Sequence, residues 1–251
     1  MTTEFPKSLV LVGAGKMGGA MLEGWIASGL QGSAVTIIDP LPSAEMSDYC
    51  AKHGIAVNPA TGSLAAPDVL VLGIKPQMLD AAAPTLAPLA SEATLVLSIL
   101  AGKTIANLKD RLPKARAFVR AMPNLPASVG RGISGAVANS EVSARQKSIS
   151  DTLLKGVGRV EWVDREALID AVTGVSGSGP AYVFYLVECL AKAGEAEGLP
   201  PDLALRLARA TVEGAGELLF KSDLSAATLR QNVTSPGGTT AAGLQILMAD
   251  T

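Results

Sequence analysis

The chain has 251 residues, of which 48% are hydrophobic and 18% are charged, so it can form one large core or two smaller ones. Its 21 basic and 23 acidic residues are spread along the sequence, which argues against nucleic-acid and anionic-membrane partners. No apolar stretch reaches the roughly 18 residues of a membrane span, and the N-terminus runs straight into a strand without room for a signal peptide, so we expect a cytoplasmic protein.

Strands and helices alternate over the first two-thirds of the chain. Short apolar strands are predicted at Leu9–Val12, Val35–Ile38, Val69–Ile74, Leu95–Ile99, Ala117–Val119, Gly132–Ala138 and Val160–Val163. The intervening helices are predicted at Met17–Ser28, Ala44–His53, Leu79–Leu89, Ile105–Leu112 and Ser143–Lys155. This rhythm predicts an α/β, Rossmann-type, doubly wound parallel sheet over residues 1–164.

The pattern changes after Asp164, where strand signals end. Two long helices are predicted at Tyr182–Glu197 and Pro201–Phe220, separated by a proline-rich stop and restart. Residues 165–251 are therefore predicted to form an all-helical domain, and the apolar and small residues of Tyr182–Phe220 predict that it is a dimerisation domain. Within the first helix, the apolar neighbours of Cys189 predict a buried thiol.

A glycine-rich turn follows the first strand, in the sequence Gly13-Ala14-Gly15-Lys16-Met17-Gly18. In a G-x-G-x-x-G motif between a strand and a helix, the glycines permit the tight turn, the approach of a pyrophosphate and close helix packing. The helix N-terminus then attracts the phosphate charge. This segment is predicted to bind a dinucleotide.

Asp39 ends the second strand, about 20 residues beyond the glycine motif, where an acidic side chain typically accepts the ribose 2′-OH. The segment Pro40–Glu45 contains no Arg or Lys that could neutralise a 2′-phosphate. The cofactor is therefore NADPH or NADH, with NADH expected to be used at least as well.

Further cofactor contacts are expected where later strands end, because ligands of open α/β sheets bind at the carboxyl edge. The predicted contact residues are Ile74, Lys75, Pro76, Ala101, Met122, Pro123 and Asn124.

Two glycine-rich segments contain more hydroxyl groups than packing requires. The first includes Ser176 and Ser178 before a predicted helix, and the second comprises Ser235, Gly237, Gly238, Thr239 and Thr240. Each is predicted to present hydroxyl groups and unpaired N–H groups at a helix N-terminus, although ordinary N-capping explains such residues as well. Together they favour a small anionic substrate.

The runs Val175–Tyr182 and Ser235–Thr240 and the loop Arg120–Asn124 closely resemble those of pyrroline-5-carboxylate reductase, and the similarity covers nearly the whole chain. The resemblance implies reduction of 1-pyrroline-5-carboxylate to L-proline, the last step of proline biosynthesis. It also implies a homodimer or an assembly of dimers, intertwined through the helical domain.

The resemblance further implies roles for individual residues. Thr240, Ser176 and Asn124 are expected to be catalytic, and Ser178, Ser235, Gly237, Gly238, Thr239 and Thr240 are expected to bind substrate. The chain departs from the family at Leu125, where threonine is common, and the family usually continues into one more helix after the position of Thr251.

Two other functions compete with this interpretation. A β-hydroxyacid dehydrogenase has a catalytic lysine at the position that Val183 occupies here, and Lys192 lies too far along the helix to replace it. A regulatory dinucleotide sensor would not need the hydroxyl-rich segments. The single histidine, His53, is expected at a solvated helix end, and the two cysteines lack metal-binding spacing, so no metal is expected.

Overall fold

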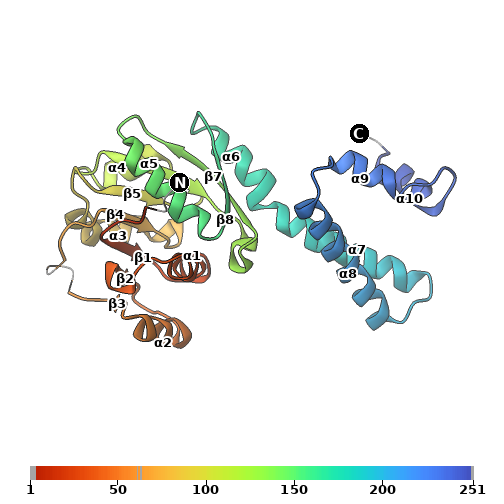
Figure 1. The fold of residues 1–251 in the computed structure, drawn as a ribbon, viewed down its shortest axis with the longest axis horizontal. Helices are drawn as coiled ribbons and strands as arrows, with labels where there is room; N and C mark the ends of the chain where they lie inside the picture. Colours follow the sequence, from red (N-terminus) through yellow and green to blue (C-terminus); the bar gives the residue numbers. More distant parts are fainter. Residues whose placement is uncertain (1–3, 61, 63, 250–251) are drawn as a thin grey trace. The chain divides into compact units, whose positions relative to one another are not determined.

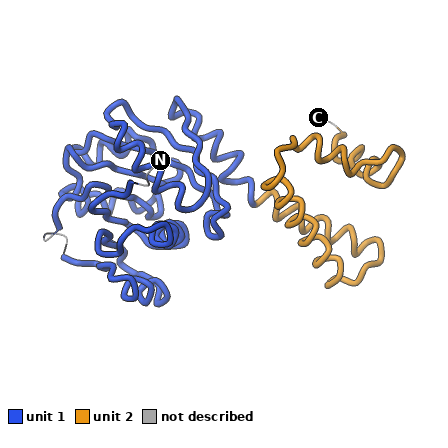
Figure 2. The backbone as a smooth tube through the Cα atoms, viewed as in Figure 1, with its two compact units in different colours: residues 1–180 blue, residues 181–251 orange. Residues whose placement is uncertain are grey.

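A computed structural model of the chain describes residues 4–60, 62 and 64–249 (Figure 1). The chain forms two compact units, residues 1–180 and residues 181–251 (Figure 2). We call them unit 1 and unit 2 and describe each by itself.

Unit 1 contains an eight-stranded sheet with the order β3-β2-β1-β4-β5-β6-β7-β8. All neighbouring strands are parallel except β6 and β7, which pair antiparallel. The strands are β1 (Leu9–Val12), β2 (Val35–Ile38), β3 (Ala56–Val57), β4 (Val69–Leu72), β5 (Leu95–Ser98), β6 (Ala117–Met122), β7 (Gly132–Ala138) and β8 (Gly158–Trp162).

The helices of unit 1 connect these strands, as Figure 1 shows. They are α1 (Lys16–Ala27), α2 (Ala44–His53), α3 (Leu79–Leu86), α4 (Ile105–Arg111), α5 (Ala144–Lys155) and α6 (Leu168–Val172). Side-chain caps fix where several begin: Ser43 accepts from the Met46 N–H at α2, and capping boxes start α4 and α5.

Alternate residues of the strands face two separate apolar cores. Leu9 and Leu11 of β1 pack with Trp25 of α1 and Leu153 of α5 in one core. In the other core, Val10 and Val12 pack with residues of α3, α4 and α6. Since successive strand side chains point to opposite faces, helices cover both faces of the sheet. The predicted fold class, including its continuous apolar strands, is confirmed.

Unit 2 is helical, with α7 (Gly179–Ala196), α8 (Pro201–Lys221), α9 (Ala226–Asn232) and α10 (Thr239–Leu247). Among the described residues of this unit, only Ala191, Ala204 and Ala208 are buried. Large apolar side chains of α7 and α8 are instead exposed, including Phe184, Tyr185 and Leu218. Within one chain, unit 2 therefore lacks a core of large side chains.

Several sequence predictions differ from the structure. The segment expected as a loop before a helix is a π-helical turn, Thr173–Gly177, which joins α6 to α7. The short strand β3 and the helices α6 and α9 were not anticipated. Cys189, expected to be buried, is exposed, since the described residues of unit 2 leave its side of α7 uncovered.

The division between the units falls at Pro180–Ala181, whereas the sequence predicts a boundary between residues 164 and 165. The two differ because α6 and the π-helical turn pack with unit 1. Ile169 of α6 belongs to one of its cores.

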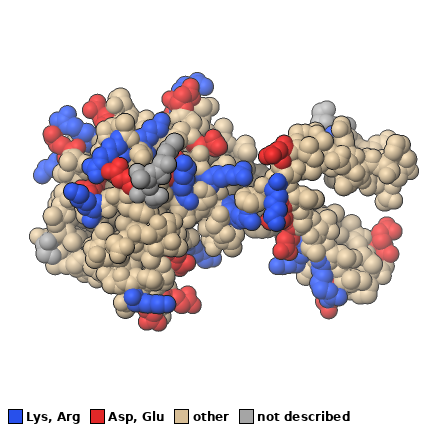
Figure 3. Space-filling view, viewed as in Figure 1, with Lys and Arg blue, Asp and Glu red and all other residues tan. Residues whose placement is uncertain are grey.

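Charged side chains of both signs are interspersed on the face drawn in Figure 3. Among the described residues, no helix combines the length and apolar character needed to cross a membrane.

Each of the chain's two tryptophans donates a hydrogen bond to a residue of α5, so replacing each one tests how much that bond contributes to stability. The indole N–H of Trp25, which is 0% exposed, donates to the Leu153 carbonyl at 2.7 Å, whereas that of the partly exposed Trp162 donates to Asp151 at 3.1 Å. We expect Trp25→Phe to lower the free energy of unfolding by about 2 kcal/mol, because it removes a buried donor and leaves a void. Trp162→Phe should cost less than about 1 kcal/mol in urea unfolding. Equal losses would contradict this account.

Candidate functional site

The glycine turn after β1 is closed by contacts that only glycine permits. Gly13 has a φ of +89°, and its N–H donates to the Ile38 carbonyl at 2.9 Å. A Cβ on Gly18 would lie 2.1 Å from the Gly13 carbonyl oxygen. Helix α1 therefore begins directly against the turn, as the motif predicts.

The N-terminus of α1 is open. Gly15 is its N-cap residue, no side chain caps the helix, and no acidic residue lies in its first turn. The first N–H groups of a helix have no intrahelical acceptor, and they carry the positive end of the helix dipole. This helix end can therefore bind an anion such as a pyrophosphate.

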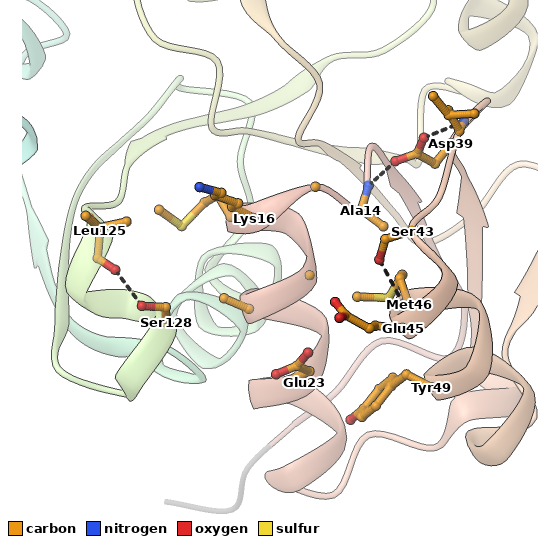
Figure 4. Close-up of a pocket in the computed structure, with 15 residues that line it drawn as sticks. Ala14, Lys16, Glu23, Asp39, Ser43, Glu45, Met46, Tyr49, Leu125 and Ser128 are labelled. Atoms are coloured by element: carbon orange, nitrogen blue, oxygen red, sulfur yellow. Dashed lines mark hydrogen bonds between the residues drawn. The ribbon is translucent and has the colours of Figure 1, made fainter.

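A cleft of about 940 Å³ adjoins this helix end (Figure 4). Its lining comes from the glycine turn, α1, the β2–α2 connection, α2 and the 3-10 helix η5 (Leu125–Val129). The lining residues are Ala14, Gly15, Lys16, Met17, Gly19, Ala20, Glu23, Asp39, Leu41, Ser43, Glu45, Met46, Tyr49, Leu125 and Ser128. Five of the predicted cofactor residues thus share one cleft: Ala14, Gly15, Lys16, Met17 and Asp39.

Asp39 ties the end of β2 to the glycine turn. One carboxylate oxygen accepts from the Ala14 N–H at 2.8 Å, and the other accepts from the Leu41 N–H at 2.9 Å. The backbone of Asp39 is held as well, because Asn58 accepts from its N–H and donates to its carbonyl. The Asp39 carboxylate consequently has a fixed place at the wall of the cleft.

The predicted cofactor residues at the ends of β4, β5 and β6 lie at the carboxyl edge of the sheet but do not line this cleft, and neither do Gly13 and Gly18. A Cβ on Gly13 would lie 2.8 Å from the backbone nitrogen of Ile74, which shows that the turns after β1 and β4 touch. Lys75 begins the connection to α3 and is exposed, as is Ala101 after β5. The cofactor contacts expected for Ile74, Lys75 and Ala101 therefore remain predictions from the sequence.

Asn124 follows β6 and bridges two segments of unit 1. Its side-chain oxygen accepts from the Ile133 N–H at 3.0 Å, and its amide donates to the Ser176 carbonyl at 3.2 Å. The Ser176 hydroxyl donates to the Val172 carbonyl at 3.0 Å. The structure therefore brings the predicted residues Asn124 and Ser176 together.

Ser178 does not present a free N–H at a helix start, contrary to the expectation from its glycine-rich surroundings. Its N–H donates to the Thr173 carbonyl at 2.9 Å, because the chain continues as a helix through this segment. π-helical turns inside α-helices often occur at functional sites. The position of this turn beside Asn124 makes it part of the candidate site.

The second hydroxyl-rich segment lies in unit 2 and matches its prediction of a helix start. Gly237 has a φ of +72°, and Gly238 is the N-cap of α10 without a capping side chain. Thr239 and Thr240 form the exposed first turn. Their N–H groups lie at an open helix end, the geometry that favours a carboxylate.

A buried arginine anchors α6 and the segment that leads into it. The Arg120 side chain on β6, 5% exposed, reaches Glu166 at 3.2 Å and Asp170 at 3.3 Å. Glu166 also accepts from the Ile105 N–H at the start of α4, at 2.7 Å. Arg120 and Glu166 thus join β6, α4 and the segment that leads into α6.

Sequence reasoning missed the part of the cleft that comes from helix faces. Glu23, Glu45 and Tyr49 belong to no motif, and only their positions on α1 and α2 place them in the lining. Burial, followed by the charges of Glu23 and Cys50, raises the pKa of Tyr49, so its hydroxyl stays neutral at physiological pH. Among the described residues, no group of three or more His, Cys, Asp or Glu side chains could hold a metal ion.

Two family models match the chain: "Pyrroline-5-carboxylate reductase dimerisation" over residues 166–251, and "NADP oxidoreductase coenzyme F420-dependent" over residues 8–102. The pyrroline-5-carboxylate reductase of Pseudomonas aeruginosa is 39% identical over 243 residues, which is 96% of this chain and 89% of the relative.

Solved structures agree with these matches. A pyrroline-5-carboxylate reductase from Coxiella burnetii superposes with a TM-score of 0.87 at 34% identity, covering 97% of this chain and 90% of that one. The Plasmodium falciparum enzyme, solved with NADP bound, has a TM-score of 0.78 at 28% identity, covering 96% and 88%.

The Rossmann-type sheet, the open glycine turn and the helical unit define a dinucleotide-dependent oxidoreductase with a dimerisation domain. The chain belongs to the pyrroline-5-carboxylate reductase family.

The two carboxylates around Arg120 should contribute unequally to stability. We expect Glu166→Ala to lower the free energy of unfolding by about 1–3 kcal/mol, because it removes acceptors from a buried guanidinium and from the Ile105 N–H. Asp170 is 82% exposed, so Asp170→Ala should cost less than about 1 kcal/mol. Urea unfolding of both variants measures the difference, and a larger loss for Asp170→Ala would refute the assignment.

Proposed function

We propose that this protein reduces 1-pyrroline-5-carboxylate to L-proline with NADH or NADPH, the last step of proline biosynthesis. The observation that carries the proposal is the uncapped N-terminus of α1, which adjoins a dinucleotide-sized cleft in a chain of this family. A cytoplasmic location, expected from the sequence, stays a prediction.

The residues of the cleft fit a dinucleotide. Gly13 and Gly18 allow the tight turn and the close approach of α1, and the first turn of α1 offers N–H groups to a pyrophosphate. Asp39 offers a carboxylate to ribose hydroxyl groups. When bound, the reduced nicotinamide supplies a hydride.

Reduction of an imine needs a hydride at carbon and a proton at nitrogen, and solvent can supply the proton before hydride arrives. The single histidine, His53, ends α2 and lies against Tyr49 in a tilted ring contact with 4.4 Å between centroids, which makes it a poor candidate for a catalytic acid. Positioning alone can contribute roughly 7–11 kcal/mol to a reaction barrier. We therefore assign the protein the task of aligning the imine with the dinucleotide and excluding water.

Asn124 and Ser176 are proposed to shape the site around the reacting groups. Asn124 is buried, and both ends of its amide are hydrogen-bonded, so its orientation is fixed. The Ser176 hydroxyl donates its hydrogen bond to the Val172 carbonyl, so its oxygen can act only as an acceptor toward a substrate. Such fixed dipoles favour one orientation of a bound substrate.

The first turn of α10 is proposed to bind the substrate carboxylate. Gly238 leaves the helix uncapped, so the N–H groups at Thr239 and Thr240 can donate to an anion. Ser235, Gly237 and the Thr240 hydroxyl complete the proposed substrate site.

We also propose that unit 2 assembles with a second copy of the chain. Its described residues bury only three alanines, while α7 and α8 expose large apolar side chains. Such surfaces mark protein–protein interfaces. The dimerisation family model covers this part of the chain, which supports a dimer or an assembly of dimers.

Oxidation of NADH and of NADPH, followed by absorbance with 1-pyrroline-5-carboxylate as substrate, tests the proposed reaction. We expect Thr240→Val to lower turnover on the order of 10²-fold while the Kd for the cofactor stays unchanged, because one donor near the substrate is lost. Thr239→Val provides a matched control on the same turn and should have the smaller effect. Unchanged turnover in Thr240→Val would remove this hydroxyl from the mechanism.

Light scattering tests the proposed assembly. We expect the wild-type chain to have at least the mass of a dimer and Phe184→Glu, a change on the apolar face of α7, to shift it toward monomer. Leu41→Glu introduces the same charge at an exposed leucine of unit 1 and should leave the mass unchanged. A stable, active wild-type monomer would count decisively against the proposed dimer.

A further inference from the structure

We infer that this chain binds NADH more tightly than NADPH, and that Asp39 selects a ribose without a 2′-phosphate. The inference rests on the proposed function only in taking the cleft at the glycine turn as the dinucleotide site. It extends the proposed function by assigning a specificity-determining residue.

The Asp39 carboxylate cannot easily turn away from the cleft. The Ala14 and Leu41 N–H groups hold its two oxygens, and Asn58 holds its backbone from both sides. An ionised carboxylate has about four acceptor positions and no proton to donate. The remaining positions can accept the hydroxyl groups of a ribose, whereas a phosphate offers no donor and repels the carboxylate.

The charges around Asp39 add to this selection. Among the residues that line the cleft, Glu23, Asp39 and Glu45 are acidic and Lys16 is basic. Figure 4 shows the Lys16 ammonium group directed toward the side of Leu125, away from Asp39. The lysine is thus placed for a pyrophosphate near the start of α1 rather than for a phosphate on the ribose at Asp39.

The connection from β2 to α2 contains no basic side chain that could offset the repulsion between Asp39 and a 2′-phosphate. It runs from Pro40 to Ser43 without Arg or Lys, and Leu41, 88% exposed, occupies the place beside Asp39 where a cation would pair with a phosphate. The first basic residue of α2 is Lys52, in its last turn.

Among the described residues that line the cleft near Asp39, those at the N-terminus of α2 could attract a phosphate. Ser43 already caps it by accepting from the Met46 N–H at 3.1 Å, and Glu45 places a negative charge in its first turn. The Ser43 cap and the Glu45 charge both weaken the electrostatic attraction between this helix end and an anion. The balance of charges therefore stays unfavourable for a 2′-phosphate.

Fluorescence titration of the full-length protein with NADH and NADPH, without pyrroline substrate, measures the two Kd values. We expect the Kd for NADPH to exceed that for NADH by about tenfold or more, reflecting like charges a few ångströms apart in a partly exposed site. Asp39→Ser should reduce this ratio to near one or below. A wild-type ratio below about ten overturns the inference.

Because Asp39 also holds the glycine turn, a second variant leaves it in place. Leu41→Arg adds a cation at an exposed position and should strengthen NADPH binding about tenfold, with NADH binding nearly unchanged. Leu41→Gln is the matched control without the charge and should preserve the wild-type ratio. Identical ratios in Leu41→Arg and Leu41→Gln would also overturn the inference.

These binding measurements separate the inference from the proposed reaction. If the protein fails to reduce 1-pyrroline-5-carboxylate but keeps the expected Kd ratio, the proposed function fails and the selectivity stands. If it reduces the substrate and binds both cofactors equally, the selectivity fails alone.

Discussion

The closeness of α1 to the turn after β1 is the constraint on which the rest of unit 1 depends. The Gly13 carbonyl leaves no room for a Cβ on Gly18, and the Gly156 carbonyl leaves none on Gly24, further along the same helix. These contacts hold α1 against β1 at one end and against the end of α5 at the other. The open helix start, whose N-cap Gly15 has no side chain, lies at the packed end of α1 and adjoins the cleft.

The cleft combines contributions that the sheet topology brings together. The strand order places β2 beside β1, so Asp39 at the end of β2 reaches the Ala14 N–H of the glycine turn. The crossover to α2 then returns over the same edge and adds Glu45 and Tyr49 to the lining. The proposed cofactor site and its inferred selectivity thus involve two adjacent strand ends, the usual site of ligand binding in such sheets.

Much of the fold could be predicted from the sequence, because buried strands and capped helices have local signals. The ranges of β1, β2, β7 and α2 agree with their predictions residue for residue. The segment at Thr173–Gly177 could not be predicted as helical, since its glycines and serine favour a loop. Long-range contacts override that preference: the Asn124 amide meets the turn, and Arg120 anchors the segment before it. Glu23 and Glu45 could not be predicted to line the cleft, because no sequence motif indicates which faces of α1 and α2 lie beside it.

The two units divide the proposed chemistry in a way that links catalysis to assembly. All residues around the dinucleotide cleft belong to unit 1, whose two apolar cores fix their positions within one chain. The open start of α10 belongs to unit 2, which buries only alanines among its described residues. A helix end orients a carboxylate best when its own position is fixed, and in the proposed dimer a second copy covers the exposed faces of α7 and α8. In the proposed dimer, cofactor binding is therefore a property of the single chain, whereas substrate orientation depends on assembly.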